Sequence, residues 1–200
     1  RDRQGMSSHV GSMHSTTWAQ EEFGSADLGD KRRTERLKAM ARGMLDRPGG
    51  KLTRVYEFKA DLEGAYRFVE SDDVAIDEME RARGEACARR LANDSLTIVP
   101  VDQASIKLSE QRKTTNFGSV GTRRSHARGV HMMTALALDN AGVVLGVLFQ
   151  DRWLRSEVRT RPLHAGRHDK RRDKRPAEAR ESFAWVRVLD GCHAQLQRHA

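Results

Sequence analysis

The sequence predicts an α+β protein in which a helical segment precedes a small antiparallel sheet. Over residues 17–93, apolar side chains recur at the three- and four-residue spacing that is typical of amphipathic helices. From residue 94 onward the pattern changes to short apolar runs separated by turn-forming residues, which indicates strands. We therefore expect a helical domain over residues 17–93 and a sheet-containing domain over residues 94–200. Residues 1–16 are rich in Ser, His and Gly without periodicity, and we expect them to be disordered.

The helical domain divides into four predicted helices. A short one spans Trp18–Phe23, and Asp30 has the side chain of an N-cap for the next. That helix ends at Arg47-Pro48-Gly49-Gly50, because proline and glycine interrupt helices. Apolar positions at helical spacing then predict a helix over Lys59–Val69. After the break at Ser71-Asp72-Asp73 they predict a further helix whose inward residues are Ile76, Met79, Ala86, Cys87 and Leu91.

The sheet-containing domain begins with three predicted strands. The apolar runs Ser95–Val101, Gly129–Leu138 and Val143–Phe149 have the length of strands, and the first leads directly into Asp102. The turn Asp139-Asn140-Ala141-Gly142 joins the last two strands by a short connection, so we expect an antiparallel meander. Residues 112–128 are polar and predict a loop. A helical period returns over residues 182–196.

The charge of the chain favours an anionic partner. Lys and Arg total 36 against 28 Asp and Glu, which gives a net charge of +8 and a pI near 10.0. Nucleic acid is the most common partner of such a protein, although a basic protein that is merely soluble has the same composition. A strongly basic insertion covers residues 152–180. Its cationic core, Arg159–Arg175, has no interleaved aromatic residues, so it predicts either phosphate contact or a disordered charged loop.

Several classes of protein are disfavoured. Cys87 and Cys192 form no CxxC pair, which fits a reducing cytoplasm. No run approaches the roughly 18 apolar residues that a membrane span needs. The histidines form no metal-ligand motif: we expect His131 in the core or at a strand edge, and His164 and His168 on the basic surface.

Two groups of residues are candidates for chemistry. Asp102 follows an apolar strand, where a rigid backbone can hold a carboxylate for Mg²⁺, although an Asp in this position also forms turns. Arg32 and Arg36 lie four residues apart on one helix face and can reach phosphates. The alternative for this helix is a solvated face on which Lys31 and Glu35 are internal partners.

An ordered set of blocks between about Trp18 and Arg155 resembles the insertion-sequence-four family of cut-and-paste DDE transposases, which includes transposon-five transposase. The blocks are Phe23–Leu37, Glu63-Gly64-Ala65-Tyr66-Arg67-Phe68, Val101-Asp102, Phe117–Gly121 with Gly129-Val130-His131, and Gly146–Arg155. The order of the set makes the resemblance specific, whereas any single block would not be.

The resemblance implies a fold and an activity. The fold would be a helical N-terminal DNA-binding domain followed by a ribonuclease-H-like sheet, here incomplete with its first three strands. The activity would be Mg²⁺-dependent cleavage and strand transfer at transposon ends, within a dimeric complex on double-stranded DNA in the bacterial nucleoid. Asp102 would be the first catalytic metal ligand. The residues that would contact transposon-end DNA are Lys31, Arg32, Arg33 and Arg36.

Two departures from the family pattern limit what the resemblance predicts for catalysis. Gln103-Ala104-Ser105 follows Asp102, where the family usually has Thr. The second Asp and the Glu of the family cannot be assigned in this sequence, and one carboxylate cannot hold two ions. We therefore expect this chain alone to be inactive as a nuclease. The alternatives are a DNA-binding regulator, a truncated transposase that binds ends without cutting them, or an inactive remnant that aggregates through an unpaired strand edge.

Overall fold

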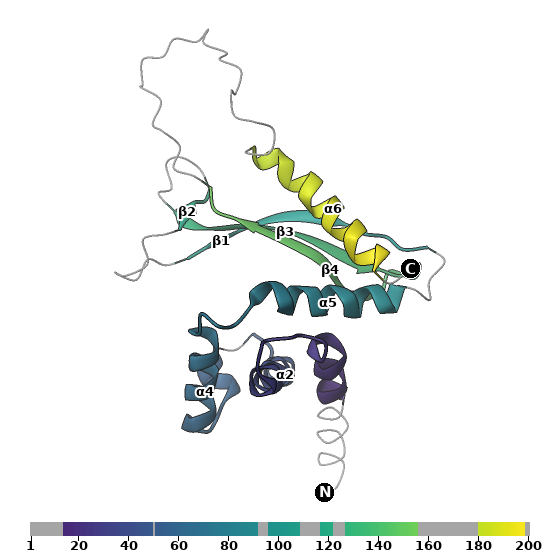
Figure 1. The fold of residues 1–200 in the computed structure, drawn as a ribbon. Helices are drawn as coiled ribbons and strands as arrows, with labels where there is room; N and C mark the ends of the chain where they lie inside the picture. The colour runs from purple at the N-terminus through teal and green to yellow at the C-terminus, as the bar shows by residue number, and fades with distance from the viewer. Residues whose placement is uncertain are drawn as a thin grey trace, which may run out of the picture. The chain divides into compact units, whose positions relative to one another are not determined.

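A computed structural model of the 200-residue chain describes residues 14–49, 51–91, 96–108, 117–121, 127–155 and 180–198 (Figure 1). The chain divides after Asp94 into a helical unit and a unit that contains the sheet. This division lies next to the boundary that the sequence predicted. Most of the basic insertion, together with His164 and His168, falls outside the described residues.

The helical unit follows the predicted order with one addition. Its first helix is described over residues 14–23, so residues 14–16 are helical where the sequence predicted disorder, and Ser15 is buried. The helices that follow are α2 (Lys31–Asp46), α3 (Leu52–Val55), α4 (Lys59–Val69) and α5 (Ile76–Leu91). α4 has the predicted bounds, and α5 lies where the sequence predicted a further helix. The sequence did not predict α3, because a single helical turn has no apolar period to recognise.

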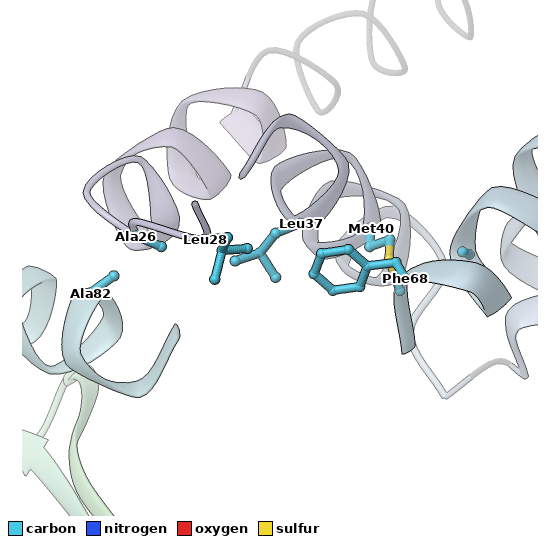
Figure 2. Packing of buried hydrophobic residues seen from close by; sticks show 7 residues of the cluster. Ala26, Leu28, Leu37, Met40, Phe68 and Ala82 are labelled. Atoms are coloured by element: carbon cyan, nitrogen blue, oxygen red, sulfur yellow. The ribbon is translucent and has the colours of Figure 1, made fainter. Parts of the chain in front are cut away.

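A small hydrophobic core joins the helices of this unit (Figure 2). Leu37 and Met40 of α2 pack with Phe68 of α4, and each of the three is buried. Burying a side chain of this size contributes about 1.5–3 kcal/mol. The apolar face of α2 is therefore fixed against its neighbours, which leaves the opposite face of the helix to solvent.

The second unit contains a four-stranded antiparallel sheet. Its strands are β1 (Val101–Lys107), β2 (Gly118–Ser119), β3 (Arg128–Leu138) and β4 (Val144–Trp153). β3 is central, with β1 along one side and β4 along the other, so the predicted antiparallel meander is confirmed. β2 pairs with the first residues of β3, inside the region that the sequence predicted as loop.

The first strand lies later in the sequence than predicted. We expected a strand over Ser95–Val101, but β1 begins at Val101 and runs to Lys107. Within the predicted run, Ile98 makes only an isolated bridge to Leu138. Pro100 explains the difference, since proline has no N–H to donate to a ladder.

Among the described residues, α6 (Ala184–Gln197) covers one face of the sheet, and a short 3₁₀ helix over Glu181–Phe183 leads into it (Figure 1). The sequence predicted α6 from the spacing of Phe183, Val186, Leu189 and Leu196, and the helix is present. Its buried face is a different one, formed by Ala184, Val188, Cys192 and Gln195, while Val186, Leu189 and Leu196 are exposed. A side chain at Gly191 would meet the Phe149 ring at 2.4 Å, so glycine allows α6 to approach β4 closely. Phe149 therefore marks the face of the sheet that α6 covers. The ribonuclease-H-like assignment stays a prediction.

Candidate nucleic-acid interface

The start of α2 is built as the sequence predicted. Asp30 is the N-cap, and its Oδ1 accepts a hydrogen bond from the backbone N–H of Arg32 at 2.8 Å. Gly29 just before it has φ 71°, a conformation that glycine adopts without strain. Thr34 Oγ1 donates to the carbonyl of Ala26 at 3.0 Å and ties the first turns to the preceding segment. The cap therefore fixes where the cations of α2 project.

The four cations predicted to bind DNA divide into two pairs. Lys31 and Arg32 are exposed, and within the described residues neither side chain has an ion-pair or hydrogen-bond partner. Arg33 and Arg36 both contact other parts of the helical unit. The unpaired cations are therefore the ones most open to an anionic ligand.

Arg33 serves the fold of the helical unit. Its guanidinium forms an ion pair and hydrogen bond with Asp73 and donates a second hydrogen bond to the carbonyl of Leu28 at 3.1 Å. Arg33 thus links the start of α2 to the segment between α4 and α5. Two of its donor groups are already used within the protein.

Arg36 occupies an intermediate position. Its Nη1 lies 3.7 Å from Oδ1 of Asp61, at the edge of ion-pair range. The guanidinium also lies against Gly64 of α4, where a Cβ would meet it at 2.8 Å. Glycine therefore makes room for Arg36 beside α4, while the weak ion pair leaves the cation open to a phosphate.

The exposed surface of α2 carries a row of residues at helical spacing. We call it the α2 face and define it as Lys31, Arg32, Glu35, Arg36, Ala39 and Arg42. A hollow of about 520 Å³ is lined by Lys31, Arg32, Glu35, Arg36, Ala39 and the cap Asp30. A second hollow of about 240 Å³ lies between α2 and the first helix, and Glu35 and Ala39 line it too. These two residues thus form a ridge with a hollow on each side.

Glu35 at this ridge is paired, although not with the expected residue. Lys38 Nζ donates to Glu35 Oε1 at 2.8 Å, whereas Lys31 was the partner considered from sequence. Lys38 also donates to Gln20 Oε1 of the first helix at 2.7 Å. Sequence reasoning missed Lys38 and Arg42 as members of this region. The available signal was a spacing of three residues, from Glu35 to Lys38 and from Ala39 to Arg42.

Asp102 lies elsewhere, in the sheet-containing unit. The sequence predicted this carboxylate at the end of a buried strand, and this is wrong: Asp102 is the second residue of β1 and is exposed. Its Oδ1 accepts a hydrogen bond from the backbone N–H of Gln103 at 2.8 Å. The shift of β1 past Pro100 accounts for the new position.

Asp102 shares a polar row with two other side chains. Its cross-strand partner is Thr134, and the next partner along the row is Gln150. Gln150 Nε2 donates to Thr134 Oγ1 at 2.9 Å. Because Phe149 faces α6, Gln150 and the rest of this row face the other side of the sheet.

His131 has the core role that the sequence predicted. The ring is buried and stacks on Trp153, with centroids 5.6 Å apart. Its Nε2 lies 3.2 Å from the carbonyl oxygen of Ser119, and its Nδ1 lies 3.0 Å from the Ser105 hydroxyl. A carbonyl only accepts, so Nε2 is the donor to Ser119, while the Ser105 hydroxyl can donate or accept at Nδ1.

Residues 15–74 match the family model described as transposase DNA-binding. The matched region runs from the first helix through α4 and includes every residue of the α2 face. The match supports a transposase N-terminal domain here. It ends before α5 and the sheet, so it does not bear on Asp102.

Two further findings concern metal binding and membrane crossing. In the described parts of the chain, no three His, Cys, Asp or Glu side chains come close enough to hold a metal ion. Nor does any helix in those parts have the length and apolar character needed to cross a bilayer.

Proposed function

We propose that this chain binds transposon-end DNA as part of a cut-and-paste transposase of the insertion-sequence-four type. The observation that carries the proposal is the cationic α2 face inside the region that matches the transposase DNA-binding family. A basic face that is fixed by a packed core presents its charges to DNA in a constant geometry. The net charge of +8 adds attraction at longer range.

The cations of α2 have different roles in this proposal. Lys31 and Arg32, which have no partner among the described residues, contact phosphates directly. Arg36 does so after its weak contact with Asp61 gives way. Arg33 acts as a positioning residue because Asp73 and Leu28 already occupy its guanidinium. Phosphate contacts of this kind set affinity and orientation but do not read sequence.

Asp102 contributes the first carboxylate of a DDE site in this proposal. Support comes from its exposure and from the resemblance of the surrounding block, and its neighbours on the row, Thr134 and Gln150, supply further oxygen atoms. The described residues by themselves do not fit a two-ion centre, because no three His, Cys, Asp or Glu side chains among them gather as possible metal ligands. We therefore derive no cleavage step from them. Mg²⁺, if held in a complete site, would act as a Lewis acid on the phosphate.

A second function, DNA binding without cleavage, is favoured by that same lack of a carboxylate cluster in the described residues. Such a protein would occupy transposon ends as a regulator. Both functions need the same α2 face, so DNA binding tests the part that they share. A cleavage assay with Mg²⁺ on end-containing DNA then distinguishes them.

The test is to titrate the full chain against duplex DNA and against a polyanion of equal charge, such as heparin, over a range of salt concentrations. We expect tighter binding to DNA, with an affinity that falls linearly in log–log form as salt increases. Equal affinity for heparin and DNA would reduce the interaction to charge alone and contradict the proposal.

A further inference from the structure

We infer that Glu35 reads a cytosine in the major groove, with Ala39 beside it against the base edges. This inference rests on the proposed function, since it needs the α2 face to lie on DNA. It adds what the phosphate-contacting cations cannot supply, namely a reader of base sequence.

The location of Glu35 is the first step. Arg32, Glu35, Arg36 and Ala39 are spaced so that they share one side of α2. Lys31 and Arg42 continue this face at its two ends. A carboxylate surrounded by cations in this way would be repelled by the phosphates if it faced the DNA backbone. The base edges of the groove, by contrast, present hydrogen-bond donors from which a carboxylate can accept.

The shape of the surface gives the second step. Glu35 and Ala39 line both hollows, which have volumes of about 520 and 240 Å³. The major groove is wide enough to admit a helix, and its two walls are sugar–phosphate strands. The surface of α2 fits this form: the ridge of Glu35 and Ala39 would enter the groove, and one sugar–phosphate strand would lie in each hollow. Arg36 lines the larger hollow and Arg42 lines the smaller one, so a cation faces each wall.

The hydrogen bonds of Glu35 provide the third step. Lys38 holds Oε1 at 2.8 Å and is itself held by Gln20 of the first helix at 2.7 Å. The Lys38 side chain is only 17% exposed, whereas the Glu35 side chain is 56% exposed. The lysine thus orients the carboxylate from beneath, and Oε2 has no partner within the described residues. An oriented, exposed acceptor loses little freedom when it binds a donor.

The chemistry of the bases selects the ligand. In the major groove the exocyclic amino group of cytosine is a donor that Glu accepts, whereas guanine presents only acceptors there. The methyl group of Ala39 suits contact with a thymine methyl group. We therefore expect a cytosine at one position of the bound site, with a thymine preference close by.

The experiment is a selection of duplexes from a random-sequence library with the full chain, followed by the same selection with Glu35→Gln and Glu35→Ala. Wild type should enrich cytosine at one position. Glu35→Gln should shift that position toward adenine, because glutamine pairs with the adenine edge, and Glu35→Ala should relax it by about tenfold or more.

Glu63→Gln is the matched control. Glu63 has the same 56% side-chain exposure and also lies near a lysine of its own helix, Lys59, but it is on α4 and lines neither hollow. It should leave the selected sequence unchanged. If wild type and Glu35→Gln select the same sequence, Glu35 is not a base reader, while the proposed function stands. If wild type selects no sequence and binds DNA no better than heparin, both the proposed function and this inference fail.

Discussion

Arg90 of α5 donates a hydrogen bond from Nη2 to Oε2 of Glu22 in the first helix, at 2.7 Å. The Glu22 side chain is 6% exposed, so solvent screens this ion pair little. We predict that Glu22→Ala lowers the free energy of unfolding by about 2–3 kcal/mol, because it leaves Arg90 without its main counter-charge in a partly buried site. Chemical denaturation monitored by circular dichroism measures this change.

Glu21 supplies the control for that experiment. It lies 3.9 Å from the same Arg90 nitrogen but its side chain is 59% exposed. Solvent screens such a contact, so Glu21→Ala should change the free energy of unfolding by less than about 0.5 kcal/mol. Equal losses from the two variants would show that burial does not determine the strength of the pair.

Substitution of Arg33 should lower the stability of the protein, whereas substitution of its neighbour Arg32 should not. Arg33→Ala removes the links to Asp73 and Leu28, so we expect a loss of about 1–2 kcal/mol in the free energy of unfolding. Arg32→Ala removes no such contact and should leave stability within about 0.5 kcal/mol of wild type. Thermal melts of the two variants side by side test this. A stable Arg33→Ala would contradict its positioning role.

Substitutions at Asp102 and at Thr134, which lie on the same row of the sheet, should differ in their effect on the free energy of unfolding. Asp102→Asn should leave the free energy of unfolding within about 0.5 kcal/mol of wild type, since the residue is exposed and an amide oxygen can still accept from Gln103. Thr134→Val removes the acceptor of Gln150 in a partly buried position and should cost about 1 kcal/mol. Urea denaturation of both variants measures the difference. A large loss from Asp102→Asn would indicate a structural carboxylate.

Cys192 should be unreactive in the folded protein. Burial raises the pKa of its thiol to about 11, and the thiolate is the nucleophile. Because this pKa is raised, little thiolate exists at pH 8, and alkylation by iodoacetamide should be slow until denaturant is added. Mass spectrometry of the labelled chain, with urea-unfolded protein as the reference, follows the reaction. Rapid labelling without denaturant would contradict the packing of α6 on the sheet.

Much of the helical unit was predictable because its signals are local. The cap Asp30, the end of α2 at the Arg47 region and the apolar period of α4 all lie within a few residues of the feature that they determine. The position of β1 was not predictable in the same way. Its exposed, mostly polar residues give a weaker pattern than the apolar run before it, and pairing with β3 decides the strand.

In the candidate site, too, the features with local signals were predictable and those that depend on distant contacts were not. Helical spacing placed Arg32 and Arg36 on one side of α2, and the structure confirms that both line one hollow. Spacing could not show that Arg33 is held by Asp73, a residue forty positions away. Nor could it show that Gln20 and Lys38 orient Glu35. These contacts depend on how the chain folds back on itself.

The central claim is that the α2 face contacts DNA phosphates, and the salt dependence of DNA affinity tests it most directly. Each phosphate contact on duplex DNA contributes about 0.9 to the log–log slope. We predict that Arg32→Ala lowers the slope by about 0.9. The control is Arg67→Ala, which should leave the slope unchanged. Arg67 is also exposed, but its guanidinium donates a hydrogen bond to the Glu63 carbonyl of its own helix. Equal slopes for wild type and Arg32→Ala would contradict the claim.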